Sequence, residues 1–124
     1  MRPKPSAAAL LEIARQTLRG DLLSALPEER RYEALMAANA IAIAGRVLER
    51  GDTPEREERA SLARLMGEKD SAIPLEILYG RLCDELRAGT VVSGTDRHRA
   101  VFAHLRRTTL DRLRESNPKA LPDG

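Results

Sequence analysis

One long segment constrains the fold of this chain more than any other. From Tyr32 to Glu49 the sequence reads YEALMAANAIAIAGRVLE, a helical pattern with apolar residues on nearly every side and Asn39 near its middle. A helix that is hydrophobic all round is typically buried among other helices. The segment therefore predicts a central, Ala-rich helix that is buried within an all-α domain.

The rest of the chain favours the same fold class. Ala, Leu, Arg and Glu, all good helix formers, recur throughout, whereas the chain has one Phe, two Tyr and no Trp. A chain of 124 residues can bury a working core in one domain without disulfides or metal. The fold class predicted is a single-domain, all-α bundle of four to five helices around the buried second helix.

Helix start and stop signals divide the chain into segments. We expect helices at about 6–26, 27–50, 53–66, 72–88 and 96–115, with the first running through Gly20 and with TVVSGT (Thr90 to Thr95) as a loop. The predicted organisation is a flexible N-terminal arm at 1–5, a helical domain at 6–117 and an irregular C-terminal tail at 118–124.

Charge and targeting signals restrict the function classes. The 21 basic and 19 acidic residues nearly balance, which is not the footprint of a dedicated nucleic-acid protein. The start lacks the core of a signal peptide, and no stretch is apolar for long enough to span a membrane. A single cysteine allows no disulfide within the chain. We expect a cytoplasmic protein.

Three polar residues form a line on the apolar segment. Tyr32, Asn39 and Arg46 are each seven residues apart, which is about two helical turns. In one interpretation they form a polar groove that binds a small ligand. In the other, Asn39 is structural and sets helix register or oligomeric state, as a lone buried polar residue can. Either way, a buried amide without partners costs about 1–3 kcal/mol.

The last predicted helix is rich in arginine. Arg99, Arg106 and Arg114 share one side of it and form a candidate docking surface for an acidic partner. The alternative is an exposed face whose charges are paired with acids elsewhere. No aromatic residue interleaves with these arginines, so a surface that stacks on bases is not expected. Arg112 projects toward the apolar side, where it either pairs with a buried carboxylate or passes into solvent.

Motifs for catalysis are missing from the sequence. It contains no phosphate-binding loop, dinucleotide fingerprint, nucleophile elbow or zinc pattern. His98 and His104 are six residues apart, so they lie on different faces of one helix and do not form a metal-binding pair. Cys83 is expected to be a small core residue. No catalytic residue, metal ligand or cofactor is predicted, and the sequence leans away from an enzyme without deciding the point.

Four segments resemble a family of short bacterial helical proteins, a domain of unknown function. They are LLEIARQTLRGDLLSAL (10–26), RYEALMAANAIAIAGRVLERG (31–51), LRAG (86–89) and LRRTTLDRLRESNPKAL (105–121). The resemblance implies an all-helical domain. It also implies a neighbourhood of genes for kinases that look like aminoglycoside phosphotransferases and for acyl-CoA dehydrogenases. It carries over no catalytic residue.

These observations lead to two main functional hypotheses and to a third, weaker one, a basic nucleic-acid module. The first is a non-catalytic accessory or regulatory protein that binds a partner enzyme, with the phosphotransferase-like kinase or the acyl-CoA dehydrogenase as the implied partner in acyl or hydroxy-acid catabolism. The alternative is a small-molecule binding protein or minor enzyme with a polar site near Asn39. A homodimer through helical faces is also expected, because the chain has more aliphatic stripes than a small domain needs to bury.

Overall fold

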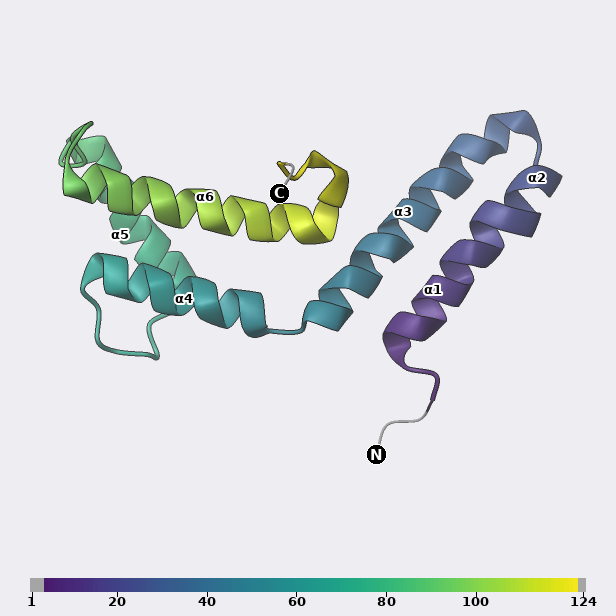
Figure 1. Cartoon of the computed structure of the whole chain (residues 1–124), viewed down its shortest axis with the longest axis horizontal. Helices are drawn as coiled ribbons and strands as arrows, with labels where there is room; N and C mark the ends of the chain where they lie inside the picture. Colours follow the sequence, from purple (N-terminus) through teal and green to yellow (C-terminus); the bar gives the residue numbers. More distant parts are fainter. Residues whose placement is uncertain (1–3, 123–124) are drawn as a thin grey trace. The chain divides into compact units, whose positions relative to one another are not determined.

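The computed structural model describes residues 4–122 of the chain (Figure 1). Within these residues it has no strand and five helical rods, which confirms the predicted all-α class. The elements are α1 (Ala7–Thr17), η1 (Leu18–Leu22), α2 (Leu23–Ala25), α3 (Glu28–Arg50), α4 (Thr53–Met66), α5 (Leu75–Ala88), α6 (Asp96–Ser116) and η2 (Pro118–Ala120).

Local signals in the sequence explain where these helices begin and end. Ser6 caps α1, because its hydroxyl oxygen accepts from the Ala9 backbone N–H at 3.2 Å. Gly67 and Gly89 follow α4 and α5 with φ of 67° and 74°, a left-handed conformation that glycine adopts without steric cost. The predicted loop between α5 and α6 is confirmed as well.

The first helical rod contains an irregular turn. The helix continues through Gly20 as predicted, but Leu18–Leu22 forms a π-helical turn, η1, between α1 and α2. A Cβ atom built on Gly20 would meet no atom within 4 Å. Close packing therefore does not explain the glycine at this position.

The contacts of the chain divide it into two compact units. Unit 1 comprises Met1–Gly51 with Leu113–Gly124, and unit 2 comprises Asp52–Arg112. The predicted domain limits at 6 and 117 stay a prediction, and parts of the predicted arm and tail, residues 1–3 and 123–124, lie outside the described residues.

Unit 1 is built on a helical hairpin in which α1 runs back along α3 (Figure 1). Ala8 and Glu12 of α1 line a cavity together with Ala42 and Gly45 of α3, which identifies the facing sides of the two helices. The last turn of α6 belongs to the same unit. There the Glu115 carbonyl oxygen accepts a 2.6 Å hydrogen bond from Nε of Arg46.

The prediction that the second helix is buried on all sides is wrong for this chain. Ala38, 1% exposed, is the only buried residue of α3. Asn39 is exposed, and the side of α3 that carries Met36 and Val47 is about half exposed. The physical reason is that, within unit 1, α1 covers only one face of a helix that is apolar on several.

Unit 2 contains the buried core of the described residues. Leu62 of α4, Leu78 and Leu82 of α5, and Val101 of α6 form one cluster in which each side chain is at most 3% exposed. These residues lie on the apolar stripes of three helices. Their packing holds α4, α5 and α6 together, and this arrangement positions the polar side chains that the three helices carry.

Candidate functional site

A buried histidine on α6 organises the polar groups of unit 2. His104 is 5% exposed, and both of its ring nitrogens have partners on other helices. Its Nδ1 lies 2.8 Å from the hydroxyl oxygen of Ser61 on α4, and its Nε2 lies 3.1 Å from the hydroxyl oxygen of Tyr79 on α5. The imidazole therefore connects three helices through part-buried hydrogen bonds.

The hydrogen bonds continue from Tyr79 to a carboxylate and an arginine. The Tyr79 hydroxyl donates to Oε2 of Glu58 on α4, and Nη2 of Arg112 on α6 lies 2.8 Å from the same oxygen. The Glu58 side chain is 13% exposed and the Arg112 side chain is 63% exposed, so Arg112 both pairs with a carboxylate of low exposure and reaches solvent, and each of the two outcomes left open by the sequence holds in part. We refer to Ser61, His104, Tyr79, Glu58 and Arg112 as the polar relay.

The direction of the relay follows from which groups can donate. An ion-paired carboxylate such as Glu58 only accepts, so Tyr79 must use its single proton on Glu58. In its contact with His104, the Tyr79 oxygen must then be the acceptor, which requires a protonated Nε2. In the neutral imidazole this leaves Nδ1 as an acceptor for the Ser61 hydroxyl. His104 is therefore placed as a hydrogen-bond acceptor, and a potential base, toward Ser61.

The environment of the relay favours neutral side chains. Burial lowers the pKa of His104 below its usual value; the Glu58 carboxylate opposes this shift, and the positive charges of Arg107 and Arg112 add to it. Burial, together with the hydrogen bond to Glu58, raises the pKa of Tyr79 to about 12. At neutral pH both rings are thus uncharged, as the directional relay requires.

A cavity of about 480 Å³ adjoins the serine and histidine of the relay. Its lining residues, from α4 and α6, are Ser61, Arg64, Leu65, Arg97, Ala100, Ala103, His104 and Arg107. The lining includes three arginines and no acidic residue. Such a combination gives the cavity a positive potential.

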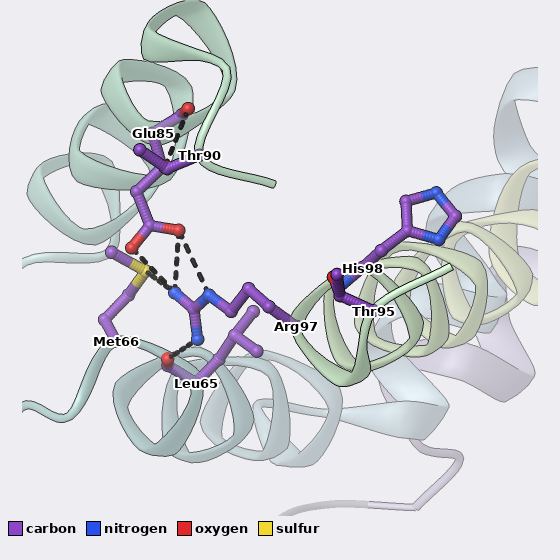
Figure 2. A network of polar contacts seen from close by, with 7 residues as sticks. All are labelled: Leu65, Met66, Glu85, Thr90, Thr95, Arg97 and His98. Carbon is purple, nitrogen blue, oxygen red and sulfur yellow. Dashed lines mark hydrogen bonds and ion pairs between the residues drawn. The ribbon is translucent and has the colours of Figure 1, made fainter. Parts of the chain in front are cut away.

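One of the three arginines is occupied by contacts within unit 2. Figure 2 shows the Arg97 guanidinium against the Glu85 carboxylate of α5, with Nη2 at 2.8 Å from both carboxylate oxygens and Nε at 3.1 Å from one of them. The same guanidinium donates to the Leu65 carbonyl oxygen and approaches the Met66 sulfur at 3.6 Å. Arg97 therefore ties the start of α6 to α4 and α5, and its charge is compensated.

The three residues predicted to form a polar groove on α3 were expected on a buried helix, but they differ in exposure. Tyr32 is 71% exposed and Asn39 is exposed, whereas Arg46 is partly buried and bonded to the Glu115 carbonyl. Arg46 lines the cavity of about 320 Å³ between α1 and α3, but Tyr32 and Asn39 are not among the lining residues of that cavity. The assumption that Asn39 is buried is wrong, because α1 packs on another side of α3.

The predicted arginine surface is exposed along α6. Arg99 pairs with Asp96 one turn earlier and donates to the Gly94 carbonyl oxygen at 3.0 Å. Arg106 and Arg114 are exposed as well, and Arg114 takes part in a further polar interaction. Whether these side chains dock a partner stays a prediction.

The sequence did not reveal the polar relay. Glu58 and Ser61 are three residues apart, and so are neighbours on α4, while His104 and Arg112 lie about two turns apart on α6. This spacing was a weak signal, since nothing in it identifies Tyr79 as the residue that joins the two helices. Cys83, in contrast, was expected in the core and is exposed.

Two properties of residues 4–122 bear on the class of function. No helix among them is both long enough and apolar enough to span a membrane. No three His, Cys, Asp or Glu side chains in this part of the chain are grouped so that they could hold a metal ion.

The fold and the relay define a small all-helical protein with a polar hydrogen-bond network between three helices. By sequence, the chain belongs to the family described as "Domain of unknown function (DUF6285)", whose model matches residues 24–120. No curated protein and no solved structure matches the chain. The family resemblance seen in the sequence is thereby confirmed at the level of a domain of unknown function.

Proposed function

We propose that the protein is a non-catalytic accessory protein that binds a partner enzyme through the outward faces of the α1–α3 hairpin. The observation that carries this proposal is the exposure of large apolar side chains on both helices. Leu10 and Ile13 of α1 are each 54% exposed, and Met36 and Leu48 of α3 are 50% and 52% exposed. Exposed apolar side chains mark an interaction surface when they gather on one face of an element.

The spacing of these residues on α3 indicates what kind of structure fits. Met36, Ala40, Ile43 and Val47 are four, three and four residues apart, so they form one stripe along the helix. Val47 is nine residues from the buried Ala38, or two and a half turns, which puts the stripe opposite the face that α1 covers. Alternating three- and four-residue spacing is typical of a seam against another helix. We therefore propose a helical element of the partner as the occupant.

The partner implied by the family resemblance is a kinase that looks like an aminoglycoside phosphotransferase, with an acyl-CoA dehydrogenase as the second candidate. The choice of these two enzymes as partners rests on the neighbourhood of genes that the family resemblance implies, and that neighbourhood is itself part of the proposal. A second copy of the chain is the competing occupant, because a two-fold dimer would place the same stripe on both sides of the interface. The small-molecule alternative near Asn39 loses its main support, since that residue is exposed.

The test is co-purification of the chain with the candidate kinase and, separately, with the candidate dehydrogenase. The double variant Met36→Glu, Val47→Glu should abolish capture, because it places two charges in the seam. The matched control, Ile77→Glu with Phe102→Glu, alters two exposed apolar residues of unit 2 and should leave capture unchanged. Circular dichroism checks that both variants stay helical.

Sedimentation equilibrium of the chain alone separates the two occupants. A mass above 13.7 kDa that returns to the monomer in the stripe variant would assign the stripe to a second copy. Equal capture of both candidates by the stripe variant and the wild type would contradict the proposed binding face.

A further inference from the structure

We propose that the cavity beside the polar relay binds a small molecule through a carboxylate or phosphate group held by Arg64 and Arg107. This site lies within unit 2 and is independent of the hairpin surface proposed above. Three features of the cavity support the proposal: charge without local compensation, the match between guanidinium groups and oxyanions, and the mixture of polar and apolar residues in the rest of the lining.

The first feature is charge without local compensation. Among the described residues, neither Arg64 nor Arg107 has an acidic side chain within ion-pair distance, whereas Arg97 in the same lining is paired with Glu85. Arg107 makes only a long contact, 3.4 Å, from Nη2 to the Glu57 carbonyl oxygen. Two guanidinium groups with free donors are therefore available to one cavity.

The second feature is the match between guanidinium groups and oxyanions. A guanidinium presents donors in a planar fork that fits two oxygens of a carboxylate or a phosphate. Arg64 lies on α4 and Arg107 on α6, so the two side chains approach from different helices. An oxyanion bound by both would place a negative charge where the lining has positive charges and no negative one.

The third feature is the rest of the lining. Leu65, Ala100 and Ala103 give it an apolar surface, and Ser61 adds one hydroxyl whose orientation is held by His104. A volume of about 480 Å³ lies within the range of small-molecule pockets, about 300–1,000 Å³. The occupant that fits is a small molecule with an anionic end for the arginines and an apolar body for the leucine and alanines.

The experiment uses the full chain and two probes, inorganic phosphate and butyrate, titrated at constant ionic strength. Binding is followed by NMR, through the backbone amide signals of α4 and α6. We expect saturable shifts confined to residues around the cavity. Tighter binding of butyrate would assign the anionic group to a carboxylate with an apolar tail, and tighter binding of phosphate would assign it to a phosphate.

Variants show whether the arginines hold the anion. Arg64→Ala with Arg107→Ala should weaken binding of the better probe at least tenfold. Arg64→Lys with Arg107→Lys keeps the charge but removes the forks, and should weaken it by a smaller factor. Arg30→Ala with Arg87→Ala removes the same charge from two exposed arginines outside the cavity and should change nothing.

Two results would overturn the proposal. One is the absence of saturable shifts near the cavity with both probes up to high millimolar concentration. The other is equal weakening by the cavity variant and the control variant, which would mean that the anions respond only to net charge. The Lys variant keeps the net charge of the wild type, so it distinguishes a loss of specific contacts from a loss of charge.

Discussion

At the scale of single residues, the buried imidazole of His104 couples the stability of unit 2 to pH. Its pKa is lowered in the folded chain, against about 6.5 when the chain is unfolded. Below about pH 6.5 the unfolded chain therefore binds more protons than the folded one, so acid favours unfolding. Stability should be full above about pH 6.5 and fall as the pH drops, by at most about 1.4 kcal/mol per pH unit.

Denaturant unfolding between about pH 7 and 5.5 measures this dependence, in a range above the usual pKa of carboxylates. His104→Gln should be less stable than the wild type, and its free energy of unfolding should depend much less on pH. His98→Gln removes the other histidine, which lies on the same helix. This variant should keep the pH dependence of the wild type. A wild-type slope that persists in His104→Gln would contradict the assignment.

The two tyrosines of the chain offer a matched comparison. Tyr79→Phe removes the hydroxyl that joins His104 to Glu58 and leaves both without that partner, so the free energy of unfolding should fall by about 1–3 kcal/mol. Tyr32→Phe makes the same chemical change at a side chain that is 71% exposed, and should stay within about 0.5 kcal/mol of the wild type. Similar stability of the two variants would show that the relay hydroxyl contributes little.

At the scale of secondary-structure elements, one glycine within α5 and one directly after it have opposite conformational requirements. Gly80 lies inside the helix, where an added Cβ would meet nothing within 4 Å, so Gly80→Ala should stabilise by about 0.5–1 kcal/mol. Gly89 follows the helix with φ of 74°, so Gly89→Ala is strained and should destabilise. Thermal melts should move in opposite directions, and a shift of the same sign for both would refute this account.

The arginine side of α6 makes a separate prediction about partner binding. Replacing Arg99, Arg106 and Arg114 with Ala should weaken capture of an acidic partner more at low salt than at high salt, because exposed charges are screened over about 10 Å at 0.1 M. The fold should be little affected, since exposed ion pairs each contribute about 0–1 kcal/mol. Capture across a salt series measures this, and unchanged capture would leave these arginines as an ordinary solvated surface.

At the scale of the whole molecule, burial is distributed unevenly between the two units. The Leu62, Leu78, Leu82 and Val101 cluster lies in unit 2, whereas Ala38 is the buried residue among those described in unit 1. Leu82→Ala should therefore cost about 2–5 kcal/mol through lost burial and the cavity left behind. Leu48→Ala, at a side chain that is 52% exposed, should cost far less in the isolated chain.

Hydrogen exchange tests the same difference in burial between the two units without any mutation. Amides of α4, α5 and α6 in unit 2 should exchange more slowly than those of α1 and α3, because sparse burial permits local opening. Addition of the partner should then protect α3 if its apolar stripe is the binding face. Faster exchange in unit 2 than in the hairpin would contradict this distribution of burial.

Much of the helix layout could be predicted from the sequence, because its causes are local. Pro27 before α3 and the glycines after α3, α4 and α5 act within one turn of chain, so their meaning does not depend on distant residues. The apolar stripe around Leu78 and Leu82 was similarly visible as helical spacing. The all-α class and the boundaries of the main helices follow from such signals.

The polar relay and the exposure of α3 were decided only by tertiary structure. Apolar spacing shows that a helix has faces to cover, but it does not show which neighbour covers them, so Asn39 was placed inside when α1 packs elsewhere. Glu58, Tyr79 and His104 lie on three helices, and their hydrogen bonds exist only once α4, α5 and α6 pack. The sequence by itself determined the helices, since helix formation depends on neighbours in the chain. Tertiary packing decided which side chains meet, because contacts between distant segments leave no periodic trace in the sequence.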